Sequence, residues 1–456
     1  CALPIYTMKK KILATLLSIV TVACLLTGCG SSSSGGSEGA ASEASGSQSA
    51  STEAEESVQE TNADSGQTEA AEGDASGAIT FWYMGDSATG IQPLIDAFTA
   101  ETGIQVNVQS IPWQNLSEML LTAIASQSGP DVMQTAVSRT AELVDADAII
   151  DMTDYVNSVD GFATDKFFEA SYESLRIGDS YYGVPWIVDV YCMLYRTDLF
   201  EQAGYTEFPT TWEEFYDACQ AVKDATGVTP YYIGAADNYN ELFCYPFQSG
   251  SEVVTEDRVA VFNQPEYINA MEYLNSFYEA GLADRVTDGV ASYVKLTNGE
   301  IAACFGGVWE TTQLAEVEEL DGKWAVALWP AGPANNNSVY AGSNLVIPSW
   351  TTNEEAAVSL IEFLTRTENQ LQYQELTGSL PAGIEAWEDE SLANDPVLSV
   401  FGEQIAHAQP FPKVPEIEEI GIEATSSYER ISVGEEDIQT VCDEMNAFAQ
   451  NLLDSE

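Results

Sequence analysis

The sequence predicts an α/β protein folded into two lobes. From Ala78 onward, segments with strand character alternate with segments of helical periodicity, which is typical of a parallel sheet covered by helices. The chain from Ala78 to Glu456 is longer than one hydrophobic core usually serves, so we expect two cores. Between Tyr181 and Phe200, a strand containing Gly, Pro, Trp and one acid leads into a continuous apolar strand and a capped turn. This stretch indicates a crossover between lobes.

The chain before Ala78 is predicted to target and tether the protein. Residues 1–28 are interpreted as a signal peptide with Cys1–Thr7 as an upstream remnant, because three lysines precede an apolar run shorter than the roughly 20 residues of a membrane span. Leu26-Thr27-Gly28-Cys29 resembles a bacterial lipobox, in which Cys29 would carry the lipid anchor. Residues 29–77 are almost entirely small, polar or acidic, and we expect a disordered acidic tether.

Charge and rare residue types exclude several functions. With 15 Lys and Arg against 72 Asp and Glu, the formal net charge is −57, so the protein would repel nucleic acid and no nucleic-acid partner is expected. His407 is the single histidine, which argues against a histidine zinc site or a Ser-His-Asp triad. We therefore expect neither a metal nor a cofactor. The cysteines after Cys29 show no CxxC spacing and are interpreted mostly as small buried apolar residues: Cys192, Cys219, Cys244, Cys304 and Cys442.

The predicted first sheet begins with three strands separated by two helices. Strand character covers 78–84, 104–111 and a segment that begins at Asp131, and helical periodicity covers 90–102 and 116–126. Ligands of parallel sheets collect at the carboxyl ends of the strands. Those ends are Tyr83–Ser87, Ile111–Trp113 and Gln134–Ser138.

The rest of the chain continues the alternation. Further helices are predicted over 212–223, 267–280 and from a cap at 352–355 to Arg366. Further strands are predicted over 302–305, 324–329 and 339–348. Gly306 and Gly307 follow the first of these strands, where glycine lets the backbone approach a ligand.

A family resemblance covers most of this chain. The sequence carries in order the blocks ITFWYMGDS, DAFTAETGIQVNVQSIPW, LLTAIASQSGPDVMQ, YYGVPWIVDVYCMLYRTDLF, FPTTWEEFYDACQAVK and NGEIAACFGGVWE, and similarity continues to Ala382. These blocks resemble the extracellular solute-binding proteins of sugar ABC importers, the maltose-binding-protein-like group. The resemblance implies a two-lobed periplasmic-binding-protein-like fold with a hinge and an interlobe ligand cleft. We predict an N-lobe from residues 78–188 and 330–377 and a C-lobe from residues 189–329 and 378–456.

A site for a neutral sugar needs aromatic planes for the ring faces and planar polar side chains for the hydroxyls. The resemblance implies ligand-binding roles for Asp86, Asp189 and Trp309, although Trp309 follows Val308 where the family has Gly-Pro. Six further candidates are placed by their positions near strand ends: Tyr83, Gln134, Trp186, Glu310, Gly342 and Asn344. None of the candidates is positively charged, which favours a neutral carbohydrate. Arg139 lies just past one strand end, so an acidic sugar stays open.

The predicted function is that of a monomeric, extracytoplasmic lipoprotein held at the cell membrane by its lipid anchor. It would close on a mono- or oligosaccharide and deliver it to the transmembrane subunits of an ABC permease, without enzymatic activity. Two alternatives stay open. Acids and aromatic rings would also bind a polyamine or another cationic solute. Asp189 and Glu310 as an acid/base pair would instead make a secreted glycoside hydrolase.

Overall fold

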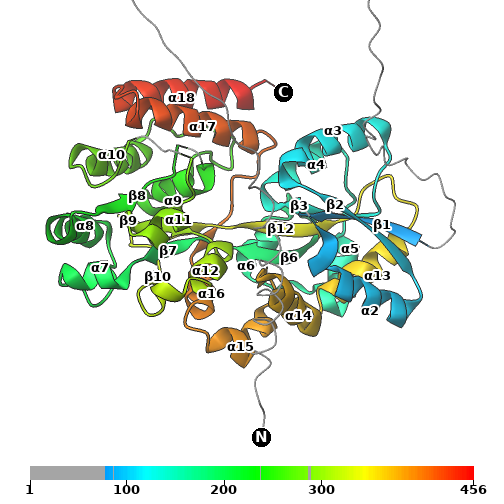
Figure 1. Ribbon diagram of the computed structural model, residues 1–456. Helices are drawn as coiled ribbons and strands as arrows, with labels where there is room; N and C mark the ends of the chain where they lie inside the picture. The colour runs from blue at the N-terminus through cyan, green and yellow to red at the C-terminus, as the bar shows by residue number, and fades with distance from the viewer. Residues whose placement is uncertain (1–77, 86, 237, 286–288, 456) are drawn as a thin grey trace, which may run out of the picture. The chain divides into compact units, whose positions relative to one another are not determined.

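Two sheets organise the computed structural model, which describes residues 78–85, 87–236, 238–285 and 289–455. One sheet has six strands in the order β13-β6-β12-β3-β1-β2, and the other has four in the order β10-β7-β9-β8 (Figure 1). The predicted signal peptide, the Cys29 anchor, the tether and Asp86 lie outside the described residues.

The first sheet starts as predicted. Strands β1 (Ala78–Met84), β2 (Gln105–Ile111) and β3 (Val132–Ala136) are parallel, and α2 (Gln92–Thr102) and α3 (Leu116–Ser126) separate them along the chain. Helix α2 ends at Gly103, which takes the left-handed conformation at φ 78° expected of a C-cap glycine. It begins two residues later than predicted because residues 88–90 form a 3-10 turn.

The remaining strands make this sheet mixed rather than wholly parallel, which corrects the prediction of a parallel sheet. Strand β6 (Val184–Asp189) lies between β13 (Leu380–Pro381) and β12 (Ala341–Val346). Strand β12 runs antiparallel to both β3 and β6. The physical reason is the route of the chain, since β12 enters the first sheet on its way back from the second.

The second sheet is built from the middle of the chain. Strand β7 (Cys192–Tyr195) is antiparallel to β9 (Ile301–Gly306) and to β10 (Ala325–Ala327), and β8 (Thr229–Tyr232) is parallel to β9. The helices of this part of the chain are α7 (Thr197–Gln202), α8 (Trp212–Thr226), α9 (Tyr239–Ser249), α10 (Pro265–Glu279), α11 (Ser292–Asn298) and α12 (Val308–Ala315). Helices α17 (Ile417–Ser432) and α18 (Ile438–Leu453) pack on α10. Strand β10 is shorter than the predicted 324–329.

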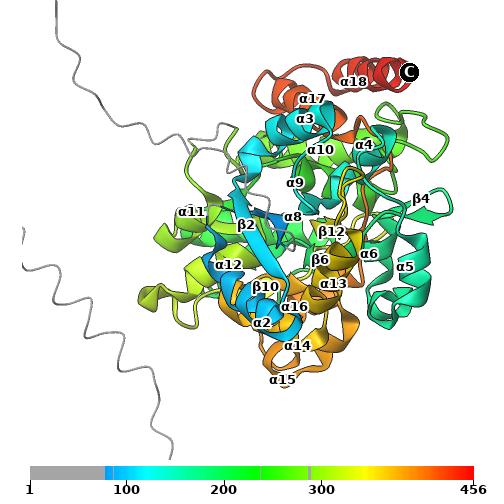
Figure 2. The same ribbon diagram turned by 90° about the vertical axis from the view of Figure 1, so that its right-hand side faces the viewer.

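Each sheet has its own hydrophobic core. The first core contains the buried rings of Phe81, Phe98 and Trp186, and the second contains those of Tyr231 and Phe243. On the first sheet, α2 and α13 (Glu354–Leu364) lie side by side (Figure 2). Two cores are the arrangement expected from the chain length, whereas the lobe limits at residues 188, 329 and 377 stay predictions.

Shorter elements complete the described chain. The helices are α4 (Thr140–Asp145), α5 (Thr153–Ser158), α6 (Glu169–Glu173), α14 (Thr367–Thr377), α15 (Glu390–Ala393) and α16 (Leu398–Ile405). Strand β4 (Arg176–Ile177) pairs antiparallel with β5 (Ser180–Tyr181). Strand β11 (Ser338–Val339) pairs parallel with β14 (Ala408–Gln409).

The segments that cross between the sheets are bonded to one another. Only Val190 and Tyr191 separate β6 from β7. The Tyr191 amide donates to Ser338 Oγ at 3.0 Å, and the Trp329 indole donates to the Tyr191 carbonyl at 2.9 Å. The outgoing and returning crossings are therefore fastened together at Tyr191.

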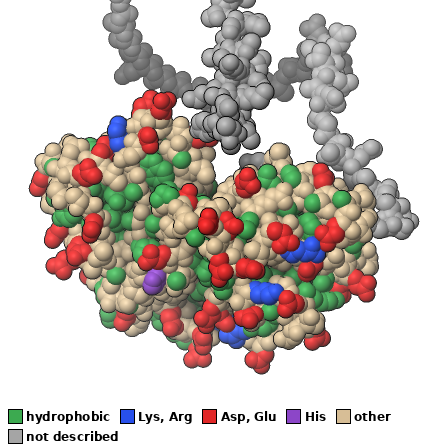
Figure 3. All heavy atoms as spheres, turned by 90° about the horizontal axis from the view of Figure 1, so that it is seen from below, with side chains coloured by type: hydrophobic (Ala, Val, Ile, Leu, Met, Phe, Trp, Pro, Cys, Tyr) green, Lys and Arg blue, Asp and Glu red, His purple; other side chains and the backbone are tan. Residues whose placement is uncertain are grey.

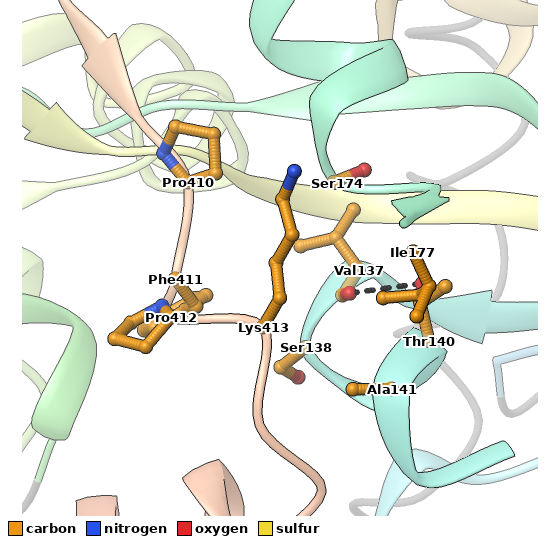
Figure 4. Close-up of a pocket in the computed structure, with 10 residues that line it drawn as sticks. All are labelled: Val137, Ser138, Thr140, Ala141, Ser174, Ile177, Pro410, Phe411, Pro412 and Lys413. Carbon is orange, nitrogen blue, oxygen red and sulfur yellow. Dashed lines mark hydrogen bonds between the residues drawn. The ribbon is translucent and has the colours of Figure 1, made fainter. Parts of the chain in front are cut away.

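A third segment, between β14 and α17, passes beside the first sheet. Figure 4 shows Pro410–Lys413 lining a small pocket opposite Val137, Ser138 and Ser174. The Lys413 ammonium pairs with Glu173 Oε2 at 2.8 Å, and Arg176 pairs with the same carboxylate. These cations lower the pKa of Glu173 to about 2. The segment is thus held to α6 by charge.

The surface is strongly acidic. Red carboxylate side chains are spread over the face in Figure 3, where blue Lys and Arg side chains are few. Within the described ranges, no helix is both long and apolar enough to cross a membrane.

Candidate functional site

The register of the strands brings the ends of both sheets to one place. In the first sheet, Ser343 pairs with Ala136 and Ala341 pairs with Asp189, so the carboxyl ends of β3 and β6 share an edge with the start of β12. In the second sheet, Cys192 pairs with Gly306. Because two residues join Asp189 to Cys192, these edges are neighbours, and the segments that follow them meet there.

Asp189 is a partly buried acid at the end of β6. Within the described chain its carboxylate has no hydrogen bond and no ion pair. Burial raises the pKa of Asp189 to about 6. A carboxylate without donors in such a place is costly unless a ligand or water supplies them.

Tyr191 connects the acids with the aromatic side chains. Its ring stacks on Phe305, with centroids 4.2 Å apart, and meets the Trp309 ring edge-on at 5.6 Å. Burial and the negative charges of Asp189 and Glu310 hold the pKa of Tyr191 well above its usual value. Sequence reasoning assigned Tyr191 to a buried strand. Its position between the two crossover strands is the signal that could have marked it as part of the site.

Trp309 and Glu310 stand in the first turn of α12. The Trp309 side chain is 49% exposed. Glu310 Oε2 accepts from the Gly307 amide and Oε1 accepts from Ser292 Oγ, both at 3.2 Å. Burial raises the pKa of Glu310 to about 7.

The two glycines before α12 make room for these side chains. A Cβ on Gly306 would lie 2.4 Å from Glu310 Oε2, and a Cβ on Gly307 would lie 2.2 Å from the Trp309 ring. A ligand was predicted to approach the backbone at Gly306 and Gly307. In the structure, the side chains of Glu310 and Trp309 lie close to the backbone there.

Other predicted site residues are packed inside the first lobe. Tyr83 and Trp186 are buried, and the Tyr83 hydroxyl lies 2.9 Å from that of Tyr373. Gln134 uses both ends of its amide, because Oε1 accepts from the Met84 amide at 2.9 Å and Nε2 donates to Ser343 Oγ at 2.8 Å. The structure does not bring these three side chains to the group around Tyr191.

Gly342 and Asn344 lie on β12. Gly342 has φ +112°, and a Cβ there would be 2.3 Å from the Ile187 carbonyl oxygen. Asn344 is fully buried and donates to Ser174 Oγ at 3.2 Å. Both therefore shape the pairing with β6, on which Asp189 sits. Ligand-binding roles for them stay predictions, as does the role of Asp86.

A second aromatic side chain stands exposed at a strand end. Trp113 follows Ile111 and Pro112 at the carboxyl end of β2, and its side chain is 46% exposed. Sequence reasoning placed this strand end at the ligand edge but did not select Trp113. Among the described residues, no group of three or more His, Cys, Asp or Glu is arranged to hold a metal ion.

Comparisons with known proteins bear on the family and the fold. The family model for bacterial extracellular solute-binding protein matches residues 82–371. The galactooligosaccharide-binding protein of Bacillus subtilis is 24% identical over 392 residues, which cover 82% of this chain and 89% of the relative. The maltodextrin-binding protein MdxE of the same organism is 23% identical, covering 79% of this chain and 87% of its own. The solved structure of the sugar-binding protein MalE from Xanthomonas citri superimposes with a TM-score of 0.78 at 27% identity, over 82% of this chain and 97% of that one.

Proposed function

This chain belongs to the bacterial extracellular solute-binding proteins, and from that premise we propose that it captures a carbohydrate between its lobes for import by an ABC transporter. The observation that carries the proposal is the exposed Trp309 ring, which meets the Tyr191 ring edge-on, while the charges of Asp189 and Glu310, two carboxylates with few donors, act on Tyr191. Relatives named for galactooligosaccharide and maltodextrin binding support a carbohydrate ligand.

The side chains match the chemistry of a sugar. Trp309 offers a flat apolar surface to the C–H face of a ring. Asp189 lacks hydrogen-bond donors in the described chain, and Glu310 has only a backbone amide and a hydroxyl. Hydroxyl groups of a ligand would supply the missing donors. The hydrogen bonds that they form with the carboxylates would replace the hydrogen bonds that they lose to water.

Capture is proposed to involve closure of the lobes. Only a ligand that contacts both sheets favours the closed state over the open one. The two hydrogen bonds that join the crossing segments at Tyr191 support a motion about a hinge between the sheets. The transmembrane subunits of a permease would then bind the closed form. The protein would act outside the cytoplasm as a monomer, held at the membrane by a lipid on Cys29.

One experiment tests this proposal. The purified protein is screened by thermal shift against mono- and oligosaccharides beside spermidine and putrescine, and its best ligand is then used in small-angle X-ray scattering. We expect stabilisation by a saccharide and compaction on binding. Trp309→Ala should weaken that binding by about 1–3 kcal/mol, the value of a large aromatic side chain lost from contact.

The matched control is Ile422→Ala, which removes a 62% exposed apolar side chain from α17. It should bind like the wild type. Stabilisation by a polyamine alone would contradict carbohydrate capture, and turnover of a sugar in the same samples would indicate a hydrolase. Binding without compaction would contradict the closing motion.

A further inference from the structure

Glu418, in the first turn of α17, is a carboxylate bonded from two sides. The Tyr239 hydroxyl, at the start of α9, donates to Glu418 Oε1 at 3.0 Å. From the other side, the Ser138 hydroxyl donates to the same oxygen, and Arg139 Nη2 lies 3.5 Å from Oε2. Ser138 and Arg139 belong to the 3-10 turn Val137–Arg139, which follows β3 of the first sheet. One carboxylate therefore connects α17 and α9 with the end of β3.

The start of α17 is anchored in the second core. Ile417 and Ile420 are buried there. Arg258 Nη2 donates to Glu416 Oε1 at 2.8 Å and to the Leu453 carbonyl at 3.0 Å, which ties the start of α17 to the end of α18. The position of Glu418 is therefore set by the second lobe.

Arg139 is positioned by the first lobe. Its Nη1 donates to Glu142 Oε2 in α4, and its Nη2 donates to Ser117 Oγ in α3, each at 2.7 Å. Leu120 and Leu143, from the same two helices, are buried in the first core. The contact of Arg139 with Glu418 therefore adds an attraction between the lobes rather than within one of them.

The stability of α17 does not by itself account for this contact. Acids in the first turn of a helix interact favourably with its dipole, and both Glu418 and Glu419 lie there. Glu419 is exposed and has no hydrogen bond or ion pair within the described part of the chain. By contrast, the side chains of Arg139 and Glu418 are only 15% and 22% exposed. Charged hydrogen bonds with little access to water are stronger than exposed ion pairs.

The charge of the protein gives a contact between the lobes a physical role. The formal net charge is −57, and carboxylates are spread over the surface (Figure 3). Two acidic lobes repel each other when they approach. An attraction between a cation of one lobe and a carboxylate of the other opposes this repulsion.

We infer that Glu418 is a clamp that holds the two lobes together before any ligand is bound, by accepting from Ser138 and Arg139 of the first lobe while Tyr239 fixes it in the second. Contacts that exist in only one of two conformations shift the population toward that conformation. The inference concerns the empty protein and does not depend on which solute is captured.

Single-molecule FRET without ligand tests the clamp. The protein is freed of co-purified solute by unfolding in urea and refolding. Dyes are attached to p-acetylphenylalanine introduced at Glu118 on α3 and at Gln439 on α18, which are exposed positions on the two lobes. The cysteines of the described chain are buried and stay unlabelled. We expect a closed and an open population, and their ratio is the measured quantity.

Glu418→Ala should lower the ratio of closed to open molecules by about tenfold or more, because it removes the charged contacts between the lobes. Glu418→Gln keeps an oxygen that can accept from the two hydroxyls but offers no charge to Arg139, so its ratio should be intermediate. Ser138→Ala should lower the ratio by less than Glu418→Ala. Adding Ser138→Ala to Glu418→Ala should cause no further fall, because both changes break the same contact.

Glu419→Ala is the matched control, since it removes an equal charge from the same turn of α17 and should keep the wild-type ratio. A wild-type ratio in Glu418→Ala, an equal fall in Glu419→Ala, or a wild-type protein with no closed molecules would overturn the clamp. Additive effects of Ser138→Ala and Glu418→Ala would contradict it as well. No sugar is present in these measurements, so each of these results would leave carbohydrate capture in place.

Discussion

Asp189 and Glu310 are the residues whose electrostatics set the site apart. Both are acids at the meeting edges of the sheets, and neither has an ion pair within the described chain. Burial raises the pKa of each, to about 6 for Asp189 and to about 7 for Glu310. In the empty protein both acids therefore oppose folding when they are ionised, which is a cost that ligand donors can reduce.

Glu310→Gln tests this cost through its pH dependence. The pKa of Glu310 is raised above its ordinary value of 4.5, so between that value and about 7 the folded state keeps a proton that the unfolded state has lost. Stability from this group therefore falls as pH rises through that window. Gln cannot ionise, and its carbonyl oxygen can still accept from the Gly307 amide while its NH2 group donates to the Ser292 hydroxyl. We expect the Tm of the variant to gain on the wild type from pH 5 to pH 8.

The control for this prediction is Glu201→Gln at an exposed position on α7. Its Tm difference from the wild type should stay flat over the same range. A flat difference for Glu310→Gln as well would contradict the effect of burial on this carboxyl.

The sequence named the two acids and Trp309 as candidates near the meeting edges of the sheets. It did not predict the direction in which every candidate side chain points. Asp189, Trp309 and Glu310 follow strand ends, where any side chain is near the edge. Tyr83 and Trp186 lie within strands, where successive side chains point to opposite faces and the pattern does not say which face is the core. Tyr191 was missed because its apolar neighbours make it look like one more buried strand residue.

At the scale of elements, β12 depends on close backbone contact. Gly342 has φ +112°, in a region that other residues rarely adopt, and its position lies against the Ile187 carbonyl and the Asp189 amide. The register of β12 with β6 also shifts between Ser343 and Asn344. This strand therefore fits beside β6 only with glycine at that point.

Gly342→Ala should lower the free energy of unfolding by roughly 2–4 kcal/mol, because the new methyl group adds a backbone clash to a strained φ. Gly103→Ala is the matched control, since Gly103 has φ +78° but no atom within 4 Å of the added Cβ. It should cost only about 1 kcal/mol. Urea unfolding of both variants measures the difference, and equal losses would show that the close contact contributes nothing.

Element types were predictable because apolar periodicity and capping residues are local. The predicted bounds of β1 and α3 agree with the structure. The direction of β12 was not predictable in this way, because it depends on where the returning chain meets the sheet. The short β10 likewise reflects its pairing with β7, which covers only Ala325–Ala327.

For the whole molecule, the two-lobed α/β fold of the solute-binding family was predicted from the order of the blocks and is confirmed by the match over residues 82–371 and by the solved relative. Length and composition alone indicated two cores, and the alternation of elements indicated the fold class. The hinge needs more than the sequence, because hydrogen bonds such as Trp329 to the Tyr191 carbonyl join residues far apart in the chain.

A lipid anchor at Cys29 is predicted to hold the molecule at the membrane. The Leu-Thr-Gly-Cys motif ending at Cys29 predicts a lipid anchor, and the composition of residues 29–77 predicts a flexible acidic chain between the lipid and the lobes. A flexible chain of that length would let the lobes reach on the order of 40 Å from the membrane. Cys29→Ala should move the protein from the membrane fraction to the medium, as measured by immunoblotting of both fractions. Ser47→Ala, a change within the same segment, should leave it with the membrane. Unchanged retention of Cys29→Ala would refute the anchor.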